Sequence, residues 1–154
     1  MYLLFRQTLR STADATLIQM ADEGAVSLSH GQTPDFFIVK QRIDLATSLS
    51  PFTIIYNKKQ LPIAANVVLD GVVPTLPTGV LIHADGKKIN KVTWQPKNKV
   101  RAAIIVIPFS GKQKGYILVG RSLLEVEKQN QIVLVFSLLS WGVSIGVLCG
   151  LFFI

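Results

Sequence analysis

The sequence predicts an α+β fold in which a long N-terminal helix packs on a five-stranded antiparallel sheet, followed by a C-terminal transmembrane helix. Three observations carry this prediction: apolar residues at helical spacing near the N-terminus, five strand-like runs in the middle, and an uncharged run at the end. We expect an N-terminal helix over 1–32, a domain over 33–124, and a juxtamembrane and transmembrane helix over 125–154. A chain of 154 residues is long enough for one domain and one anchor.

The first helix is predicted from about Leu3 to Ser29, because apolar residues recur there at spacings of three and four. Gly31 follows as the stop signal. The narrow apolar stripe either packs on the sheet or forms the seam of a homodimer. Its members are Leu9, Ala13, Leu17, Met20, Gly24 and Leu28.

A shorter helical segment is predicted next, because Thr33-Pro34-Asp35 combines a cap, a proline and an acid in the order typical of a helix start. The segment continues through Ser48, and Ser50-Pro51 ends it. We therefore expect a second helix between the long helix and the first strand.

Two strands at 52–56 and 61–66 then form a predicted hairpin around the polar turn Asn57-Lys58-Lys59-Gln60. Pro62 has no amide proton to donate to a ladder, so the second strand belongs at a sheet edge. A long surface connection follows from Asp70 to Gly79, marked by prolines and glycines.

Three more strands complete the predicted sheet, at Ile89–Gln95, Arg101–Phe109 and Tyr116–Arg121. Between Ala102 and Ile107 there is no polar residue, so the alternation typical of a half-exposed strand is missing. This strand is predicted to be central and covered on both faces.

The C-terminal stretch Ile132–Ile154 has 23 residues and no charge. As a helix it is about 35 Å long, against a hydrocarbon core of about 30 Å, so we expect it to span a membrane rather than to be a buried soluble helix. Gly142, Gly146 and Gly150 recur every four residues. This spacing lets a second helix approach closely, and so predicts a partner helix in the membrane.

Composition and charge argue against several other classes. The net charge is +7, but the basic residues are scattered in pairs, so no nucleic-acid partner is predicted. Cys149 is the only cysteine and lies in the apolar stretch, where one thiol forms neither a disulfide nor a metal cluster. We predict no cofactor and no metal.

No enzymatic activity is predicted, because the chain shows no nucleophile with a base, paired acids or phosphate loop. His83 and Asp85 are expected in a polar loop, where such residues are usually solvated. Ser110-Gly111-Lys112 is expected to be a hairpin turn. The enzymatic alternative requires a catalytic constellation around His83 or Arg101.

The predicted elements follow one another as helix, hairpin, long connection and three-stranded meander, and the last strand leads into a membrane helix. In this order the chain resembles the extracytoplasmic PAS-like sensor domains (single-Cache type) of bacterial two-component receptors. Four segments are also similar to an uncharacterised bacterial family of two-span membrane proteins with such a domain. They are 51–66, Val92-Thr-Trp-Gln-Pro96, Val100–Val106 and Gly115–Glu127.

The resemblance implies a PAS-like sheet, a location at the cell membrane with the domain outside the cytoplasm, and a small ligand of unknown identity between the sheet and the long connection. For this site we name Tyr56, Trp94 and Arg101, an aromatic pair with a cation suited to a small carboxylate. Arg121 and Glu125 are predicted to form a salt bridge at the junction through which a signal passes toward the membrane.

Charge does not determine which side of the membrane the domain occupies, since the positive-inside rule counts only short loops. A single C-terminal span leaves the domain in the cytoplasm. If a first span is missing before Tyr2–Phe5, the domain lies outside, as the resemblance implies.

The leading hypothesis for function is a membrane-anchored, non-enzymatic sensor module that binds a small ligand or passes a signal through its C-terminal span. The alternative is a structural or interaction protein, tail-anchored or in the envelope, that holds a partner at the membrane and binds no metabolite. The predicted partners are the lipid bilayer and either a second copy of the chain or another membrane helix.

Overall fold

The computed structural model describes residues 2–36, 38, 41–85, 89–124 and 140–141, and no side chain is described for residues 2–13 and 78. Three helical segments are present in this part of the chain: α1 (Tyr2–Ser29), the 3₁₀ helix η1 (Pro34–Phe36) and α2 (Thr78–Asp85). The strands are β1 (Ile43–Asp44), β2 (Phe52–Asn57), β3 (Pro62–Ala65), β4 (Val67–Val68), β5 (Asn90–Lys97), β6 (Val100–Ser110) and β7 (Lys114–Ser122).

The main sheet has five antiparallel strands in the order β3-β2-β7-β6-β5, which confirms the predicted α+β class and the five-stranded sheet. The pairing of β2 with β7 joins the predicted hairpin to the predicted meander, from Phe52 opposite Gly120 to Asn57 opposite Gly115. A second sheet, which we did not predict, consists of the short parallel pair β1 and β4.

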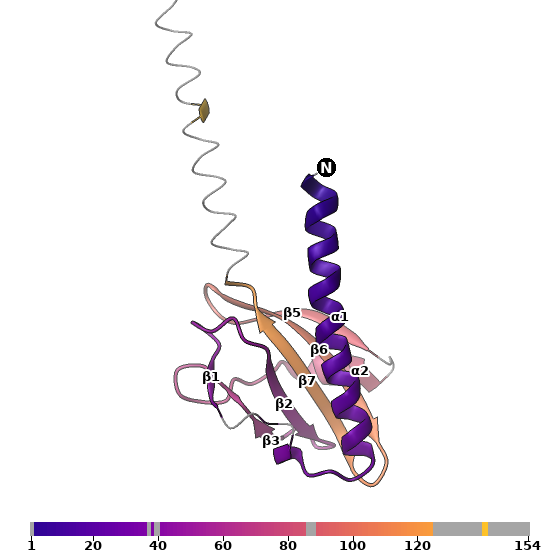
Figure 1. The fold of residues 1–154 in the computed structure, drawn as a ribbon. Coiled ribbons are helices and arrows are strands. Elements are labelled where there is room, and N and C mark those ends of the chain that lie inside the picture. The colour runs from indigo at the N-terminus through magenta and orange to yellow at the C-terminus, as the bar shows by residue number, and fades with distance from the viewer. Residues whose placement is uncertain (1, 37, 39–40, 86–88, 125–139, 142–154) are drawn as a thin grey trace, which may run out of the picture.

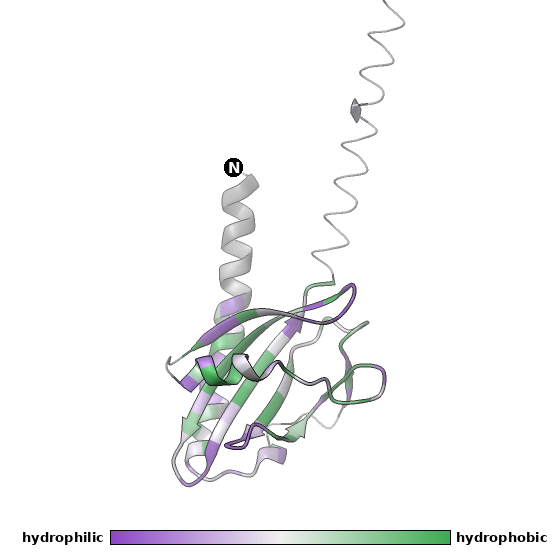
Figure 2. Ribbon diagram, turned by 180° about the vertical axis from the view of Figure 1, so that it is seen from behind, coloured by the Kyte–Doolittle hydropathy of each residue, from purple (hydrophilic) through white to green (hydrophobic). Residues whose placement is uncertain are grey.

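Helices cover both faces of the main sheet. The long helix α1 packs across β6 and β7 on one face, and α2 lies over β5 and β6 on the other (Figure 1). Figure 2, seen from behind, shows α2 crossing the hydrophobic middle of the strands. The predicted packing of the long helix on the sheet is therefore confirmed.

The central strand β6 contributes alternate side chains to two cores. Ile104 and Val106 are buried in the core on the α2 side, and Ile105 and Ile107 are buried in the core beneath α1. Burying a side chain of this size stabilises the fold by about 1.5–3 kcal/mol. The prediction of a central strand covered on both faces is confirmed.

The long helix ends where the sequence indicates. The amide of Gly31 donates to the carbonyl oxygen of Leu28 at 3.0 Å, and Gly31 has a φ of +93°, a conformation that glycine adopts without a steric penalty. The predicted apolar stripe is wrong at Met20, which is 40% exposed, whereas Ala21 is fully buried. The face packed on the sheet runs through Leu17, Ala21, Ala25 and Leu28, spacings of four and three.

The predicted hairpin is confirmed. The amide of Gln60 donates to the carbonyl oxygen of Asn57 at 2.9 Å, and the Asn57 side chain accepts from the amide of Leu61 at 3.0 Å. The second strand, β3, is an edge strand and begins with Pro62, as the missing amide proton requires.

The predicted helix through Ser48 is wrong in extent. Among the described residues of this segment, Pro34–Phe36 forms a single 3₁₀ turn at the predicted start, and Ile43–Asp44 forms a strand instead of helix. The Asp44 carboxylate accepts from the amide of Ala46 at 2.9 Å, a local turn that competes with helix. Pairing of this strand with Val67–Val68 then fixes the extended backbone.

A helix that we did not expect, α2, begins at Thr78, near the end of the predicted long connection, and continues to Asp85. Leu81 and Ala84 are buried at a spacing of three and attach this helix to the sheet. Eight residues with a glycine at the second position give a weak periodic signal, so packing rather than local propensity fixes the helix. His83 and Asp85, expected in a polar loop, lie in α2.

No helix in the described part of the chain is long and apolar enough to cross a bilayer. The predicted span at 132–154 falls outside the described residues, apart from Ser140 and Trp141.

Candidate functional site: a tyrosine pair beside the second helix

The aromatic pair predicted for a ligand site shares one face of the sheet but not one location. Tyr56 lies opposite Tyr116, whereas Trp94 aligns through Ala102 with Ser122, six positions farther along β7. Six positions correspond to about 20 Å along the strand, and three strand spacings of about 4.8 Å separate β2 from β5. One small ligand does not bridge this distance.

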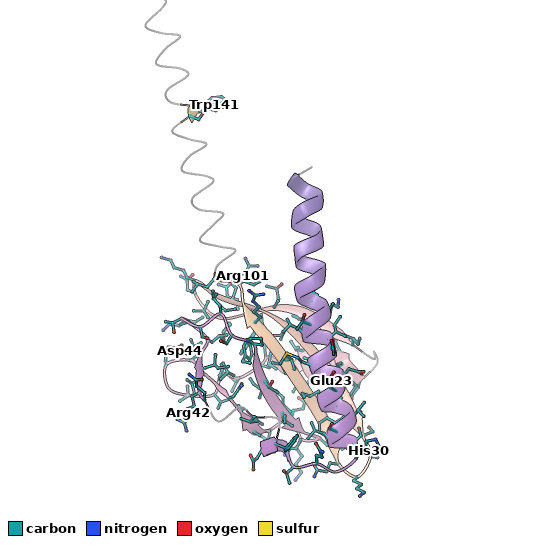
Figure 3. All side chains as sticks on the ribbon, in the orientation of Figure 1. Glu23, His30, Arg42, Asp44, Arg101 and Trp141 are labelled. Atoms are coloured by element: carbon teal, nitrogen blue, oxygen red, sulfur yellow. The ribbon has the colours of Figure 1, made fainter. Side chains whose placement is uncertain are left out.

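Arg101, the third predicted site residue, belongs to the other face. Ala102 and Ile104 point into the core on the α2 side, so alternation along β6 places Arg101 on the α1 side. Its side chain is exposed, at the end of the sheet away from His30 (Figure 3). The structure thus does not bring Tyr56, Trp94 and Arg101 together, and the expected preference for a carboxylate loses its basis.

The remaining predicted positions are tested only in part. Arg121 is exposed near the end of β7, while Glu125, its predicted salt-bridge partner, lies outside the described residues. The predicted packing face at Gly142, Gly146 and Gly150 also lies outside them. These interpretations stay predictions.

The structure instead brings together two tyrosines and one acid. Tyr56 and Tyr116 lie directly opposite each other on β2 and β7, and both belong to the core on the α2 side. The Tyr116 hydroxyl donates to Oδ2 of Asp85 at 2.8 Å. Because Asp85 is the last residue of α2, this bond attaches the helix end to the strand.

The Tyr56 hydroxyl is the most unusual polar group of the site. The residue is only 3% exposed, and its hydroxyl oxygen is buried with no hydrogen-bond partner among the described residues. A buried hydroxyl left unsatisfied costs about 1–3 kcal/mol. Nearly all buried polar groups in folded proteins have a partner, so the Tyr56 hydroxyl is an exception within the described part of the chain.

Both phenols keep their protons in the folded protein. Burial raises the pKa of Tyr116 to about 12, and the hydrogen bond to Asp85 and its negative charge act in the same direction. Burial alone raises the pKa of the Tyr56 phenol above its ordinary value. The site therefore contains two neutral hydroxyl groups, and the one on Tyr116 donates to the carboxylate of Asp85.

These groups can recognise a ligand by hydrogen bonding. The Tyr56 hydroxyl donates to a carbonyl or amide oxygen, or accepts from an N–H group. The carboxylate of Asp85 next to the pair disfavours an anion and favours a neutral or cationic molecule.

The other residues with possible chemistry lie elsewhere. Nδ1 of His83 is 2.7 Å from the carbonyl oxygen of Gly79, a contact within α2 itself. Within the described ranges, no three residues of the types His, Cys, Asp and Glu gather as metal ligands.

Sequence reasoning identified Tyr56 but missed Tyr116 and Asp85. The pairing of Tyr56 with Tyr116 depends on the register between the first and last strands of the sheet, and the contact with Asp85 depends on the unexpected helix. One signal was present: each tyrosine adjoins a short aliphatic run at its polar-turn end, with Ile54-Ile55 before Tyr56 and Ile117-Leu118-Val119 after Tyr116.

Comparisons of the chain with protein-family models, with curated proteins and with solved structures found no match. The functional interpretation therefore depends on the fold, the tyrosine pair and the sequence.

Proposed function

We propose that the chain is a membrane-anchored sensor-like module of the PAS-like extracytoplasmic type, without enzymatic activity, that binds a small ligand at the tyrosine pair. The observation that carries the proposal is the buried Tyr56 hydroxyl, which has no partner among the described residues. A buried polar atom among apolar side chains can fix the orientation of a bound ligand.

The order of elements supports the PAS-like part of the proposal. A long helix, a hairpin, a connection that covers the sheet and a three-stranded meander follow one another in the described structure, as in the domains that the sequence resembles.

The position of β7 supports a signalling role. This strand carries Tyr116 near its start and ends at Ser122, a few residues before the predicted membrane helix at 132–154. A ligand that competes for Asp85 changes how α2 is attached to β7. The same strand leads to the predicted signal junction at Arg121 and Glu125, so a change at the tyrosine pair reaches the membrane through one element.

A thermal-shift measurement on the full-length chain in mild detergent tests this proposal. The panel contains small neutral amides, amines, amino acids and carboxylates, because the site predicts neutral or cationic ligands over anions. A bound ligand raises the melting temperature with its concentration. The expected shift is lost in Tyr56→Phe and kept in Trp94→Phe, which changes the same sheet face at a distant position.

Two results would contradict the proposal. The first is that no member of the panel raises the melting temperature. The second is that the shift is kept in Tyr56→Phe and lost in Trp94→Phe.

A second candidate function is an interaction module that holds a partner protein at the membrane. It is favoured by exposed apolar side chains beside the edge strand β3: Phe36 is 73% exposed, Leu61 57% and Ile63 47%. A photo-crosslinking residue at Ile63 in native membranes tests it, with the same residue at Ile82, 55% exposed on α2, as control. A partner specific to Ile63 supports this function, and equal labelling from both positions contradicts it.

A further inference from the structure

Cations and exposed apolar side chains lie together at one end of the sheet, which we name the exit end. It is the end at which β7 finishes at Ser122, opposite Ala102, and at which the turn between β5 and β6 lies. The amide of Leu123 continues the ladder by donating to the carbonyl oxygen of Arg101 at 2.8 Å. The N-terminal turns of α1 project beyond the sheet at this same end (Figure 1).

The exit end is basic. Two lysines, Lys97 and Lys99, lie at the β5–β6 turn, and Arg101 and Arg121 lie on the neighbouring strands. Lys97 forms an ion pair with Asp70 at 2.8 Å. Two further acids, Glu125 and Glu127, follow in the sequence and reduce the positive charge of this end.

Apolar side chains lie beside these cations. Val72 is 66% exposed and Val73 is 38% exposed. Both border a shallow hollow of about 650 Å³ that Pro96 and Lys97 also line. Exposed aliphatic side chains next to cations are typical of surfaces that sit in the headgroup region of a bilayer.

The projecting part of α1 continues this pattern in the sequence. Arg6 and Arg10 are the only charged residues between Tyr2 and Ala13, and Tyr2–Phe5 is apolar. Twelve helical residues extend about 18 Å, which is more than the thickness of one headgroup layer, roughly 5–8 Å. When the exit end touches the headgroups, this part of the helix is therefore long enough to reach past them.

The length of chain before the predicted span decides which end of the domain can reach lipid. Leu124 is followed by seven residues, 125–131, before the span begins at Ile132. Seven residues reach at most about 25 Å. The opposite end is also basic, with Lys58, Lys59, Lys112 and Lys114, but it lies a further strand length of about 30 Å away.

We infer that the exit end docks on a membrane surface by contact of its cations with anionic phospholipid headgroups and by insertion of Val72 and Val73. This inference rests on the proposed membrane anchor and adds a fixed orientation of the domain on the bilayer. The occupant is lipid because the short connection keeps this end at the surface, where the local concentration of headgroups is high.

The test uses the full-length chain in nanodiscs with a fluorescent probe at position 72, in the variant Val72→Cys/Cys149→Ala. Cys149 is the only native cysteine, so its removal leaves one labelling site. The discs contain phosphatidylcholine with or without phosphatidylglycerol, and a headgroup nitroxide as quencher. The control carries the probe at the opposite end, in Lys112→Cys/Cys149→Ala.

We expect strong quenching of the probe at position 72 in anionic discs, weaker quenching in neutral discs, and none at position 112. The double variant Lys99→Glu/Arg121→Glu is expected to lower the ratio of docked to undocked domain by at least about fivefold for each cation. The matched variant Lys58→Glu/Lys114→Glu, at the opposite end, is expected to change this ratio little.

A chain that is held in the discs but gives equal quenching at positions 72 and 112 overturns the docking and leaves the anchor standing. Quenching at position 72 that responds equally to both double variants also overturns it. A chain that does not enter the discs overturns both the anchor and the docking.

Discussion

Tyr56→Phe and Tyr116→Phe each remove one hydroxyl group, at two positions that face each other on neighbouring strands. The structure nevertheless predicts opposite effects of the two variants on stability. In Tyr56→Phe the lost hydroxyl is buried and has no partner among the described residues. Its removal relieves a penalty of about 1–3 kcal/mol, so we expect the ligand-free protein to become about 1 kcal/mol more stable.

In Tyr116→Phe the lost hydroxyl is bonded to Asp85 at 2.8 Å. Hydrogen bonds to charged groups contribute roughly 1.5–3 kcal/mol, and the exposure of Asp85 reduces this to about 1 kcal/mol because water replaces the lost donor. The two variants are therefore expected to differ by about 2 kcal/mol in unfolding free energy.

Urea unfolding of the full-length chain in detergent, without ligand and followed by far-UV circular dichroism, measures this difference. Each kcal/mol corresponds to roughly 2–4 °C in melting temperature for a chain of this size. If Tyr56→Phe loses as much stability as Tyr116→Phe, the Tyr56 hydroxyl has a partner in the ligand-free protein, and the central argument for the site fails.

Three further predictions follow from the described residues. Folding raises the pKa of Tyr116 to about 12. The stabilisation that its protonated form contributes is therefore expected to be fully present below pH 10 and to be lost as the pH rises through 12. If Tyr116→Phe unfolds at alkaline pH with the same profile as the unchanged protein, Tyr116 is not the cause. A Cβ atom at Gly120 would lie 2.5 Å from Cζ of Phe52, so Gly120→Ala is expected to lower the unfolding free energy by about 1–3 kcal/mol. Gly79→Ala in α2 has open space around the new methyl group and is expected to raise it by up to about 1 kcal/mol. If thermal unfolding shows Gly120→Ala to be the more stable of the two variants, the packing described for Gly120 is wrong. Asp70→Ala breaks an exposed ion pair and should change the unfolding free energy by less than about 1 kcal/mol; a larger loss in urea titration would show a structural role for Asp70.

The elements with a strong periodic signal could be predicted from the sequence. In α1, apolar residues three and four positions apart fall on one side of the helix, and this side is the buried one. In β6, successive residues point to opposite faces, so an unbroken apolar run indicates that both faces are buried. Met20 was assigned to the buried face because it lies three positions after Leu17 and four before Gly24, a spacing that Ala21 satisfies equally well with four and three.

Elements that depend on distant contacts could not be predicted. The short strand β1 exists because it pairs with β4, more than 20 residues later, and α2 exists because Leu81 and Ala84 attach to the sheet. Neither segment is long enough to show a periodic pattern of its own.

The candidate site shows the same limit. Tyr56 attracted notice as an aromatic residue in a strand, but its neighbour Tyr116 comes from the last strand, and only the register brings them together. Trp94 and Arg101 looked equally suitable in the sequence, and they are excluded from this location by distance along the strands and by the alternation of faces.

The anchor on which the proposed function depends can be measured through Trp141. The chain has two tryptophans, so Trp94→Phe leaves Trp141 alone as a fluorescent reporter. Trp141 is two residues from the middle of 132–154, which places it within about 3 Å of the bilayer centre in a spanning helix. In liposomes whose acyl chains carry bromine near their ends, we predict strong quenching of Trp141. Emission typical of a tryptophan in water, unchanged by the brominated lipids, would show that this segment does not cross the membrane.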